Sequence, residues 1–358
     1  MVYFSLYGIW CLEHIKDMNN ILMVVGSDPL LHVVKDLKMS NNLDYVFLKT
    51  CYNAPLNMKK NFGECLFYLQ EKISNNIYDY LFPTIDGFSL FISYLNERYN
   101  LPGIRSYTAS KIMSKFSYYQ IFDSLNIPYP KIYTKVDSNG ITNYNDIKYP
   151  CIIKPTNKAG GADIQILLDC YDKNQAIDNL KFQNEADLKY FFGDNIKYIQ
   201  KEEFIIQGYI DGDVCSCMGI IKDGTIQIDL IFDIIPAKGI YPAEVGLHYP
   251  SKYAELKTNI TNYIEKFFDN IKLDNSPFMF DIVIKDNQMF FIDFGARISS
   301  NPLLLLYYRK INYGSFMINK IINDIDYKIE MKKTSLMMRN SNNAINDSDL
   351  FKNGFDIT

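Results

Sequence analysis

Two acidic residues in the C-terminal third of the chain, Asp281 and Asp293, have a spacing that suits a metal-binding pair. Residues 280–297 read as two apolar strands joined by a Lys-Asp-Asn turn, with one aspartate on each strand. Across a tight hairpin, a separation of twelve residues can bring both carboxylates to the same side. Facing carboxylates repel each other unless a cation lies between them, and Mg²⁺ prefers such hard oxygen ligands. Arg297 follows at a distance that lets it meet an anion held by that metal, so the segment indicates phosphate chemistry.

A second candidate phosphate site lies at the end of the apolar run 149–155, where Lys154 precedes a glycine-rich turn containing Gly160 and Gly161. A lysine ammonium supplies positive charge, and glycines let backbone N–H groups approach phosphate oxygens. Gly-Gly hairpins are common, so this segment alone is weak evidence. The chain contains neither Gly-x-x-x-x-Gly-Lys-Ser/Thr nor Gly-x-Gly-x-x-Gly, which argues against a P-loop and a dinucleotide fold.

Residues 205–213 combine an apolar strand with an Asp-Gly turn and include Gln207, Tyr209, Ile210 and Asp213. The backbone of such a strand can pair with the edge of a purine. An ordinary strand followed by a turn has the same pattern, and by itself the segment favours that simpler interpretation.

The elements that must position these residues alternate between strand and helix in the first hundred positions. Strand patterns at 21–25, 45–48 and 80–82 are separated by helical patterns, an order typical of a parallel sheet with crossover helices. Residues 108–125 read as one helix, which the Pro128 segment ends because proline cannot continue a helix. Short strands follow, including a hairpin with Asp223 and Gly224 at its turn.

The bulk composition is that of a globular protein. The 358 residues are 48% hydrophobic and carry a net charge of −4, which disfavours nucleic-acid binding. The seven cysteines are odd in number and form no Cys-x-x-Cys pair, so neither a disulfide framework nor a zinc cluster is expected. No apolar run has the length of a membrane span, and we expect a cytoplasmic protein that binds no membrane.

Taken together and in this order, the segments resemble the ATP-grasp superfamily, and within it the carboxylate–amine (thiol) ligases. The resemblance covers residues 20 to 325 and rests on five segments: Lys115 to Pro130, Tyr149 to Ile164, Ile205 to Asp213, Phe280 to Arg297, and the helical patterns after Asn301. It implies an α/β (α+β) chain with an ATP-grasp fold. An N-terminal Rossmann-like domain of parallel α/β structure would span 1–107. A small lid subdomain would span 108–205, a C-terminal antiparallel-sheet catalytic subdomain 206–340, and a polar tail 341–358.

The resemblance also implies roles for single residues. Lys115 and Lys154 would hold the α- and β-phosphates of ATP, and Gly160 and Gly161 would lie in a mobile loop over the γ-phosphate. The adenine edge would be lined by Gln207, Tyr209 and Ile210, with Asp213 near the ribose. Asp281 and Asp293 would bind Mg²⁺, with Mn²⁺ as an alternative metal, and Arg297 would stabilise the transferred phosphoryl group and an acyl-phosphate intermediate.

Two positions depart from the family pattern. The hinge usually has Glu after the Gln, where this chain has Gly208, and the last motif usually reads Glu-x-Asn-x-Arg, where this chain has Asp293-Phe294-Gly295-Ala296-Arg297. Gly295 supplies no side chain, so one magnesium ligand is missing and water can take its place.

The substrate side is less specified. Lys238 stands near the place where many ligases have a carboxylate-binding Arg, with Tyr241, Glu244 and His248 nearby; a solvated loop fits that segment equally well. Arg105, Lys111 and the Asp86-Gly87 turn are weaker candidates.

The sequence thus predicts an ATP-dependent ligase that acts on a small carboxylate and an amine, with a homodimer left open. A kinase on the same scaffold and a non-catalytic nucleotide-binding module are the alternatives.

Overall fold

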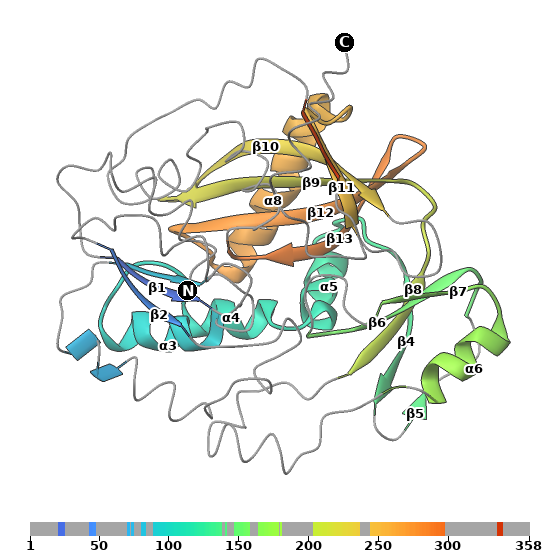
Figure 1. Ribbon diagram of the computed structural model, residues 1–358, viewed down its shortest axis with the longest axis horizontal. Coiled ribbons are helices and arrows are strands. Elements are labelled where there is room, and N and C mark those ends of the chain that lie inside the picture. Colours follow the sequence, from blue (N-terminus) through green and yellow to red (C-terminus); the bar gives the residue numbers. More distant parts are fainter. Residues whose placement is uncertain are drawn as a thin grey trace.

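The structure, a computed structural model, describes residues 21–25, 43–47, 70–71, 73–74, 80–83, 89–137, 140–141, 147–157, 164–178, 180, 203–236, 244–297 and 335–338. Within these residues the strands form three sheets, one of three, one of five and one of six strands (Figure 1). No helix in this part of the chain is long and apolar enough to cross a membrane.

The N-terminal strands form a parallel sheet, as the alternating pattern predicts. Strand β1 (Ile21–Val25) lies between β2 (Leu43–Phe47) and β3 (Tyr80–Pro83), and it pairs with both in parallel. Helix α3 (Ser89–Arg98) follows β3.

The single helix predicted for residues 108–125 is wrong, because the structure has two helices here. Helix α4 (Ser106–Ile112) ends before Ser114, whose backbone is extended, and α5 (Lys115–Ser124) begins directly afterwards. The first N–H of α5, that of Lys115, donates to the backbone carbonyl of Thr156 at 2.7 Å. The break therefore joins the start of α5 to the strand that carries Lys154.

The second sheet is antiparallel and has the strand order β5-β4-β8-β6-β7. Its strands are β4 (Ile132–Asp137), β5 (Gly140–Ile141), β6 (Cys151–Pro155), β7 (Gln165–Leu167) and β8 (Phe204–Gly208). Helix α6 (Cys170–Asp178) packs beside β7. Its buried Ala176 joins residues of this sheet in a small hydrophobic core, separate from the main one.

The third sheet is also antiparallel, with the order β13-β12-β9-β10-β11-β14. Its strands are β9 (Asp213–Lys222), β10 (Thr225–Pro236), β11 (Glu244–Tyr249), β12 (Ser276–Lys285), β13 (Gln288–Gly295) and β14 (Ser335–Met338). The predicted hairpin at Asp223 and Gly224 is confirmed: both turn residues have positive φ, as a tight two-residue turn requires.

Helix α8 (Lys257–Ile271) covers one face of the six-stranded sheet, and the short 3₁₀ helix η6 (Ala254–Leu256) precedes it (Figure 1). The helix buries residues at helical spacing, namely Ile260, Ile264, Phe267, Phe268 and Ile271. Aromatic rings continue this core into α5, since Phe122 lies edge-to-face with Phe267 at 4.9 Å between centroids.

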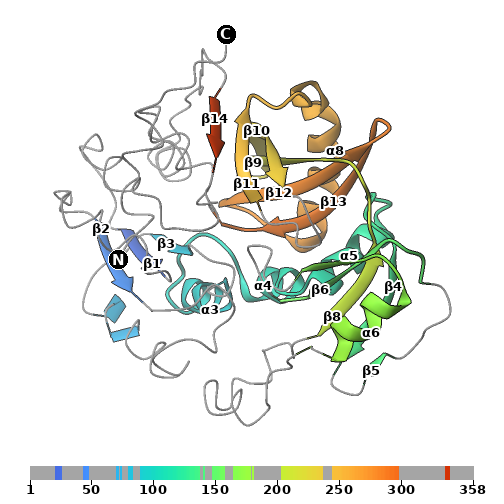
Figure 2. The same cartoon turned by 45° about the vertical axis from the view of Figure 1, so that its right-hand side comes forward.

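Helix α5 lies where the two antiparallel sheets approach each other (Figures 1 and 2). It runs beside β13, the edge strand of the six-stranded sheet, and the backbone N–H of Phe291 on that strand donates to Pro128 O at 2.8 Å. Helix α5 thus covers the edge of the six-stranded sheet and also lies beside the five-stranded sheet. Side chains from the helix and from both sheets can therefore meet at one place.

The domain boundaries stay predictions. The boundaries at 107/108 and 205/206 fall inside α4 and β8. The helical patterns after Asn301 lie outside the described residues.

Candidate functional site

The two aspartates face each other across the β12–β13 hairpin. The register pairs Asp281 directly with Asp293, and residues directly opposite in an antiparallel pair have their side chains on the same face. Nearer the turn, Ile282 pairs with Phe291, so a regular ladder would place Ile292 opposite Asp281. A β-bulge at this point adds one residue to β13 and brings Asp293 to the face of Asp281.

Buried residues along β13 follow the same shift. Met289 and Phe291 belong to the core before the bulge, and Phe294 and Ala296 after it. The change of phase lets the strand keep its apolar side chains in the core while it turns Asp293 toward the site.

Helix α5 contributes two groups that contact Asp293. Lys115 Nζ donates to Asp293 Oδ1 at 2.7 Å, and Tyr118 OH donates to the same oxygen at 2.8 Å. Only 9% of the Lys115 side chain and 27% of the Asp293 side chain are exposed. An ion pair with so little solvent is screened far less than one on the surface.

Strand β6 supplies the second lysine. Lys154 is 4% exposed, and its Nζ donates to Tyr119 OH at 2.8 Å and to Ile292 O at 3.0 Å. Tyr119 OH in turn donates to Ile292 O at 2.6 Å, so the carbonyl of the bulge residue accepts from two groups. Burial lowers the pKa of Lys154 to about 7, the positive charge of Lys115 adds to the decrease, and the two aspartates oppose it.

The two aspartates have different proton affinities. Burial raises the pKa of Asp281 to about 7, and the negative charges of Asp293 and Glu244 add to the rise, while a hydrogen bond with Ser216 and the charge of Arg297 oppose it. Burial also acts against the ionised form of Asp293, but the charges of Lys115 and Lys154 outweigh it and lower the pKa. One carboxylate therefore stays charged beside two lysines, and the other holds a proton up to near neutral pH.

Atom Oδ1 of Asp281 is buried and has no hydrogen-bond partner among the described residues. A buried carboxyl oxygen without a partner costs free energy, which a cation bound to the ionised form would recover. In the part of the chain that the structure describes, no group of three or more His, Cys, Asp or Glu side chains is placed to hold a metal ion. Two carboxylates are enough for Mg²⁺, which usually keeps several waters and binds substrate phosphates.

The predicted adenine strand is β8, which ends at Gly208. Gln207 is 2% exposed and its Oε1 has no hydrogen-bond partner among the described residues, while Tyr209 and Ile210 lie just beyond the strand. Because Gln207 pairs with Ile152 and Lys154 pairs with Ile205, Gln207 and Lys154 lie diagonally on one face of the five-stranded sheet.

Asp213 begins β9 and is exposed. Lys252 Nζ lies 2.8 Å from its Oδ2, and Tyr253 OH donates to the same oxygen. The carboxylate is therefore already engaged by two neighbours, and its contact with a ribose stays a prediction.

Of the other predicted site residues, one lies near the aspartate pair and several lie outside the described residues. Arg297 follows the end of β13, close enough for its charge to act on Asp281. Gly160, Gly161, Lys238, Tyr241 and the Asp86-Gly87 turn lie outside the described residues.

The remaining substrate candidates have partners elsewhere. Arg105 donates to Asn96 O at 3.1 Å, and the ammonium of Lys111 lies 5.5 Å from the centre of the Tyr107 ring. His248 Nδ1 lies 3.5 Å from Asp233 Oδ2 on β10.

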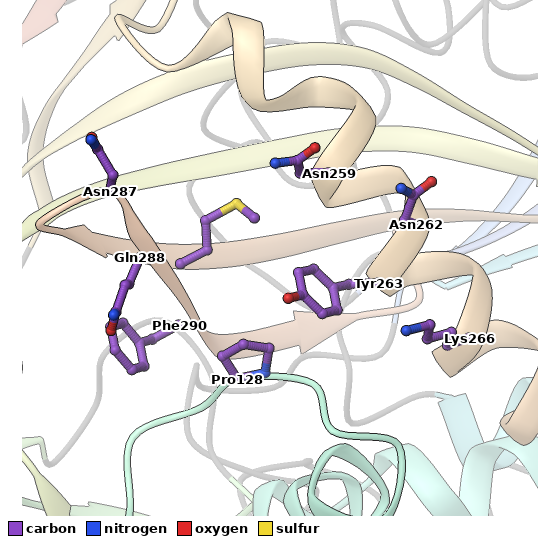
Figure 3. A pocket seen from close by; sticks show the side chains of 9 residues that line it. Pro128, Asn259, Asn262, Tyr263, Lys266, Asn287, Gln288 and Phe290 are labelled. Carbon is purple, nitrogen blue, oxygen red and sulfur yellow. The ribbon is translucent and has the colours of Figure 1, made fainter.

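An open groove of about 460 Å³ lies apart from this cluster, between α8 and the β12–β13 hairpin (Figure 3). Its lining is rich in side-chain amides and comprises Pro128, Asn259, Asn262, Tyr263, Lys266, Asn287, Gln288, Met289 and Phe290. None of the predicted site residues lines it.

Sequence reasoning missed Tyr118 and Tyr119, although a signal was present. Lys115, Tyr118, Tyr119 and Phe122 follow one another at the helical spacing of three, four and seven residues, and all four are buried. A lysine on the apolar face of a helix needs polar partners, and the two tyrosines on that face supply hydroxyl groups beside it.

Comparison with known proteins bears on the fold that positions these residues. Residues 147–301 match the family model of the ATP-grasp domain. An L-amino acid ligase from Bacillus licheniformis is 15% identical, with a TM-score of 0.69 over 90% of this chain and 80% of that one. D-alanine–D-alanine ligase from Bacillus anthracis is 16% identical, with a TM-score of 0.60 over 86% and 97%.

A third similar structure is the biotin carboxylase domain of 2-oxoglutarate carboxylase from Hydrogenobacter thermophilus, in complex with MgADP, ADP and bicarbonate. It is 11% identical, with a TM-score of 0.64 over 93% of this chain and 71% of that one. At these identities the likeness establishes the fold. Together with the matched domain, it confirms the fold expected from the sequence: residues 147–301 match the ATP-grasp domain, and the chain has the ATP-grasp fold.

Proposed function

We propose that the protein is an ATP-dependent ligase that activates a carboxylate as an acyl phosphate and couples it to an amine, releasing ADP and phosphate. The observation that carries this proposal is the placement of two lysines from two elements beside the Asp281–Asp293 pair: Lys115 of α5 donates to Asp293, and Lys154 of β6 donates to the backbone carbonyl next to it. Two cations beside two carboxylates suit a triphosphate and its metal better than they suit a purely structural ion pair, because no described residue is a hydrogen-bond partner of Asp281 Oδ1.

Asp281 and Asp293 would hold Mg²⁺, and Mn²⁺ suits the same oxygen ligands. The bound metal would offset the negative charge of the ATP phosphates. Gly295 adds no side-chain ligand, so water would complete the coordination. The similar biotin carboxylase domain binds MgADP, which supports a nucleotide–metal site in this fold.

The chain's own residues would act mainly by position and charge. Lys115 and Lys154 would hold the phosphates, the segment with Gly160 and Gly161 would cover them, and Arg297 would offset the charge of the transferred phosphoryl group. Transfer of the γ-phosphoryl of ATP to a substrate carboxylate gives an acyl phosphate and ADP. An amine then attacks the acyl carbon through a tetrahedral intermediate, and phosphate leaves. Lys238 is the proposed contact for the substrate carboxylate.

Two solved ligases of similar fold are an L-amino acid ligase and a D-alanine–D-alanine ligase, by their names. They support amino acids as the first carboxylates and amines to test. The cytoplasmic location and the homodimer stay predictions.

Hydroxylamine trapping tests the acyl phosphate and separates a ligase from a kinase. Hydroxylamine attacks an acyl phosphate and yields a hydroxamate, whereas a stable phosphorylated alcohol yields none. With Mg-ATP and a pool of carboxylates, we expect a hydroxamate that requires both enzyme and ATP. ADP formation with a phosphorylated product and no hydroxamate would favour the kinase. ATP binding with neither product under any pool would favour the nucleotide-binding module.

A further inference from the structure

The hydroxyl of Tyr119 lies at the junction of three elements of the proposed nucleotide site. Tyr119 is fully buried on α5, and its oxygen contacts the Lys154 ammonium of β6 and the Ile292 carbonyl of β13. A side-chain hydrogen bond with Gln207 of β8 reaches the same hydroxyl.

Counting protons fixes the direction of each of these hydrogen bonds. A phenol has one proton to donate, a backbone carbonyl only accepts, and an ammonium only donates. Tyr119 OH therefore donates its hydrogen bond to Ile292 O at 2.6 Å and accepts one from Lys154 Nζ at 2.8 Å. Gln207 can reach the phenol oxygen only as a donor, through the NH₂ group of its amide.

This direction also fixes how the amide of Gln207 faces. With its NH₂ group toward Tyr119, the carbonyl oxygen Oε1 points away from the phenol, and it is buried with no partner in the part of the chain that the structure describes. A buried acceptor of this kind costs free energy until a donor reaches it. Gln207 lies on the face of the five-stranded sheet that carries Lys154, so a nucleotide held by that lysine can bring such a donor.

We propose that Tyr119 is a positioning residue that holds Lys154 against the Ile292 carbonyl and orients the Gln207 amide so that its oxygen accepts a hydrogen from an exocyclic amino group of the base. The inference rests on the proposed function. A 6-aminopurine offers that donor, whereas a 6-oxopurine places its carbonyl oxygen against the Gln207 oxygen, and both of these atoms are acceptors. Tyr119 would thus set base selectivity and phosphate binding through two different neighbours.

The aromatic cluster offers a matched control. Tyr129 stacks on Tyr119 with 5.2 Å between ring centroids, and its hydroxyl contacts the exposed Asp123 at 3.2 Å. Tyr129→Phe removes a phenol hydroxyl from the same cluster without touching Lys154 or Gln207. Tyr119→Phe removes the hydroxyl under test and keeps the ring.

The experiment is calorimetric titration of each protein with Mg-ATP and with Mg-ITP, whose base carries an oxygen at position 6. For the wild type and Tyr129→Phe we expect ATP to bind about tenfold or more tightly than ITP. For Tyr119→Phe we expect ATP affinity to fall about tenfold and the ATP/ITP ratio to fall toward one. Melting curves check that each variant is folded.

A Tyr119→Phe variant with the wild-type ATP affinity and ATP/ITP ratio would overturn the inference while leaving the proposed function intact. Wild-type protein that binds neither nucleotide would overturn the proposed function as well. If Tyr119→Phe does not fold, Gln207→Met takes its place, because it removes the oriented oxygen directly. A ratio that survives in Gln207→Met overturns the inference, because the oxygen that Tyr119 is proposed to orient would then not recognise the base.

Discussion

Asp281 and Asp293 face each other only because Ile292 is an extra residue in β13. The bulge turns Asp293 to the side of Asp281, and the Ile292 carbonyl accepts hydrogen bonds from Tyr119 and Lys154. One local irregularity thus aligns the carboxylates and anchors a lysine beside them, which is a common use of bulges near active sites.

Removing the charge of Lys115 should change metal and nucleotide binding in opposite directions. Lys115 neutralises Asp293 at 2.7 Å, so Lys115→Met leaves the facing carboxylates without their nearest cation. We expect Mn²⁺ affinity without nucleotide to rise about tenfold and ATP affinity to fall about tenfold, because a hydrogen bond to a charged group is worth roughly 1.5–3 kcal/mol. Calorimetry with each ligand measures both. Unchanged Mn²⁺ affinity would remove Asp293 from the metal site.

Lys154→Ala should weaken ATP binding by about tenfold or more, since the lysine supplies charge from a buried position with little competing solvent. Calorimetric titration with ATP measures the change. The exposed Lys285, at the end of β12, serves as a control of equal charge, and Lys285→Ala should bind ATP as the wild type does. Equal affinities for the two variants would exclude Lys154 from the nucleotide site.

The free energy of unfolding without ligands should include opposing pH effects from Asp281 and Lys154. Asp281 keeps its proton to about pH 7 in the folded protein but loses it near 3.8 when unfolded, so its contribution falls as pH rises over that window. Lys154 loses its proton at about 7 when folded and near 10.5 when unfolded, so its contribution rises from about pH 7 upward.

Urea titrations from pH 4 to 10, with a chelator present, test these two slopes. Asp281→Asn should remove the fall below pH 7, and Lys154→Met should remove the rise above it. Variant curves that run parallel to the wild-type curve at all pH values would show that neither group titrates as described.

Gly219 should be among the residues of the six-stranded sheet least tolerant of a side chain. A Cβ at this position would overlap the backbone oxygen of Gln227 and would lie 2.8 Å from the Phe278 ring. We expect Gly219→Ala to lower the free energy of unfolding by about 1–3 kcal/mol or more, because β9 would have to shift against β10. Thermal melting measures this.

Gly224 provides the matched control. It has positive φ with open space around it, and Asn tolerates that conformation. Gly224→Asn should therefore cost little. Equal losses for the two variants would contradict the packing described for Gly219.

Much of this arrangement could be predicted because it is local in the sequence. The hairpin around Asp281 and Asp293, the strand ending near Lys154 and the parallel N-terminal strands all follow from short apolar runs and turn residues. These signals depend on neighbouring residues alone.

The rest depends on contacts between distant segments. The extended backbone at Ser114, which divides the predicted helix, accompanies a hydrogen bond from Lys115 to Thr156 that no local pattern indicates. The role of Tyr119 likewise requires β6, β8 and β13 to meet at its hydroxyl. Propensity and spacing cannot specify such meetings, because tertiary packing decides them.

The most direct test of the central claim compares ADP formation by the wild type and by Asp293→Asn, with Mg-ATP and pooled amino acids, small carboxylates and amines. We expect ADP from the wild type only when the pool is present, and turnover at least about a hundredfold lower for Asp293→Asn at an unchanged melting temperature. Dividing the pool would then identify the substrates. Wild-type rates from a folded Asp293→Asn variant would contradict the assignment of this carboxylate pair as the centre of the reaction.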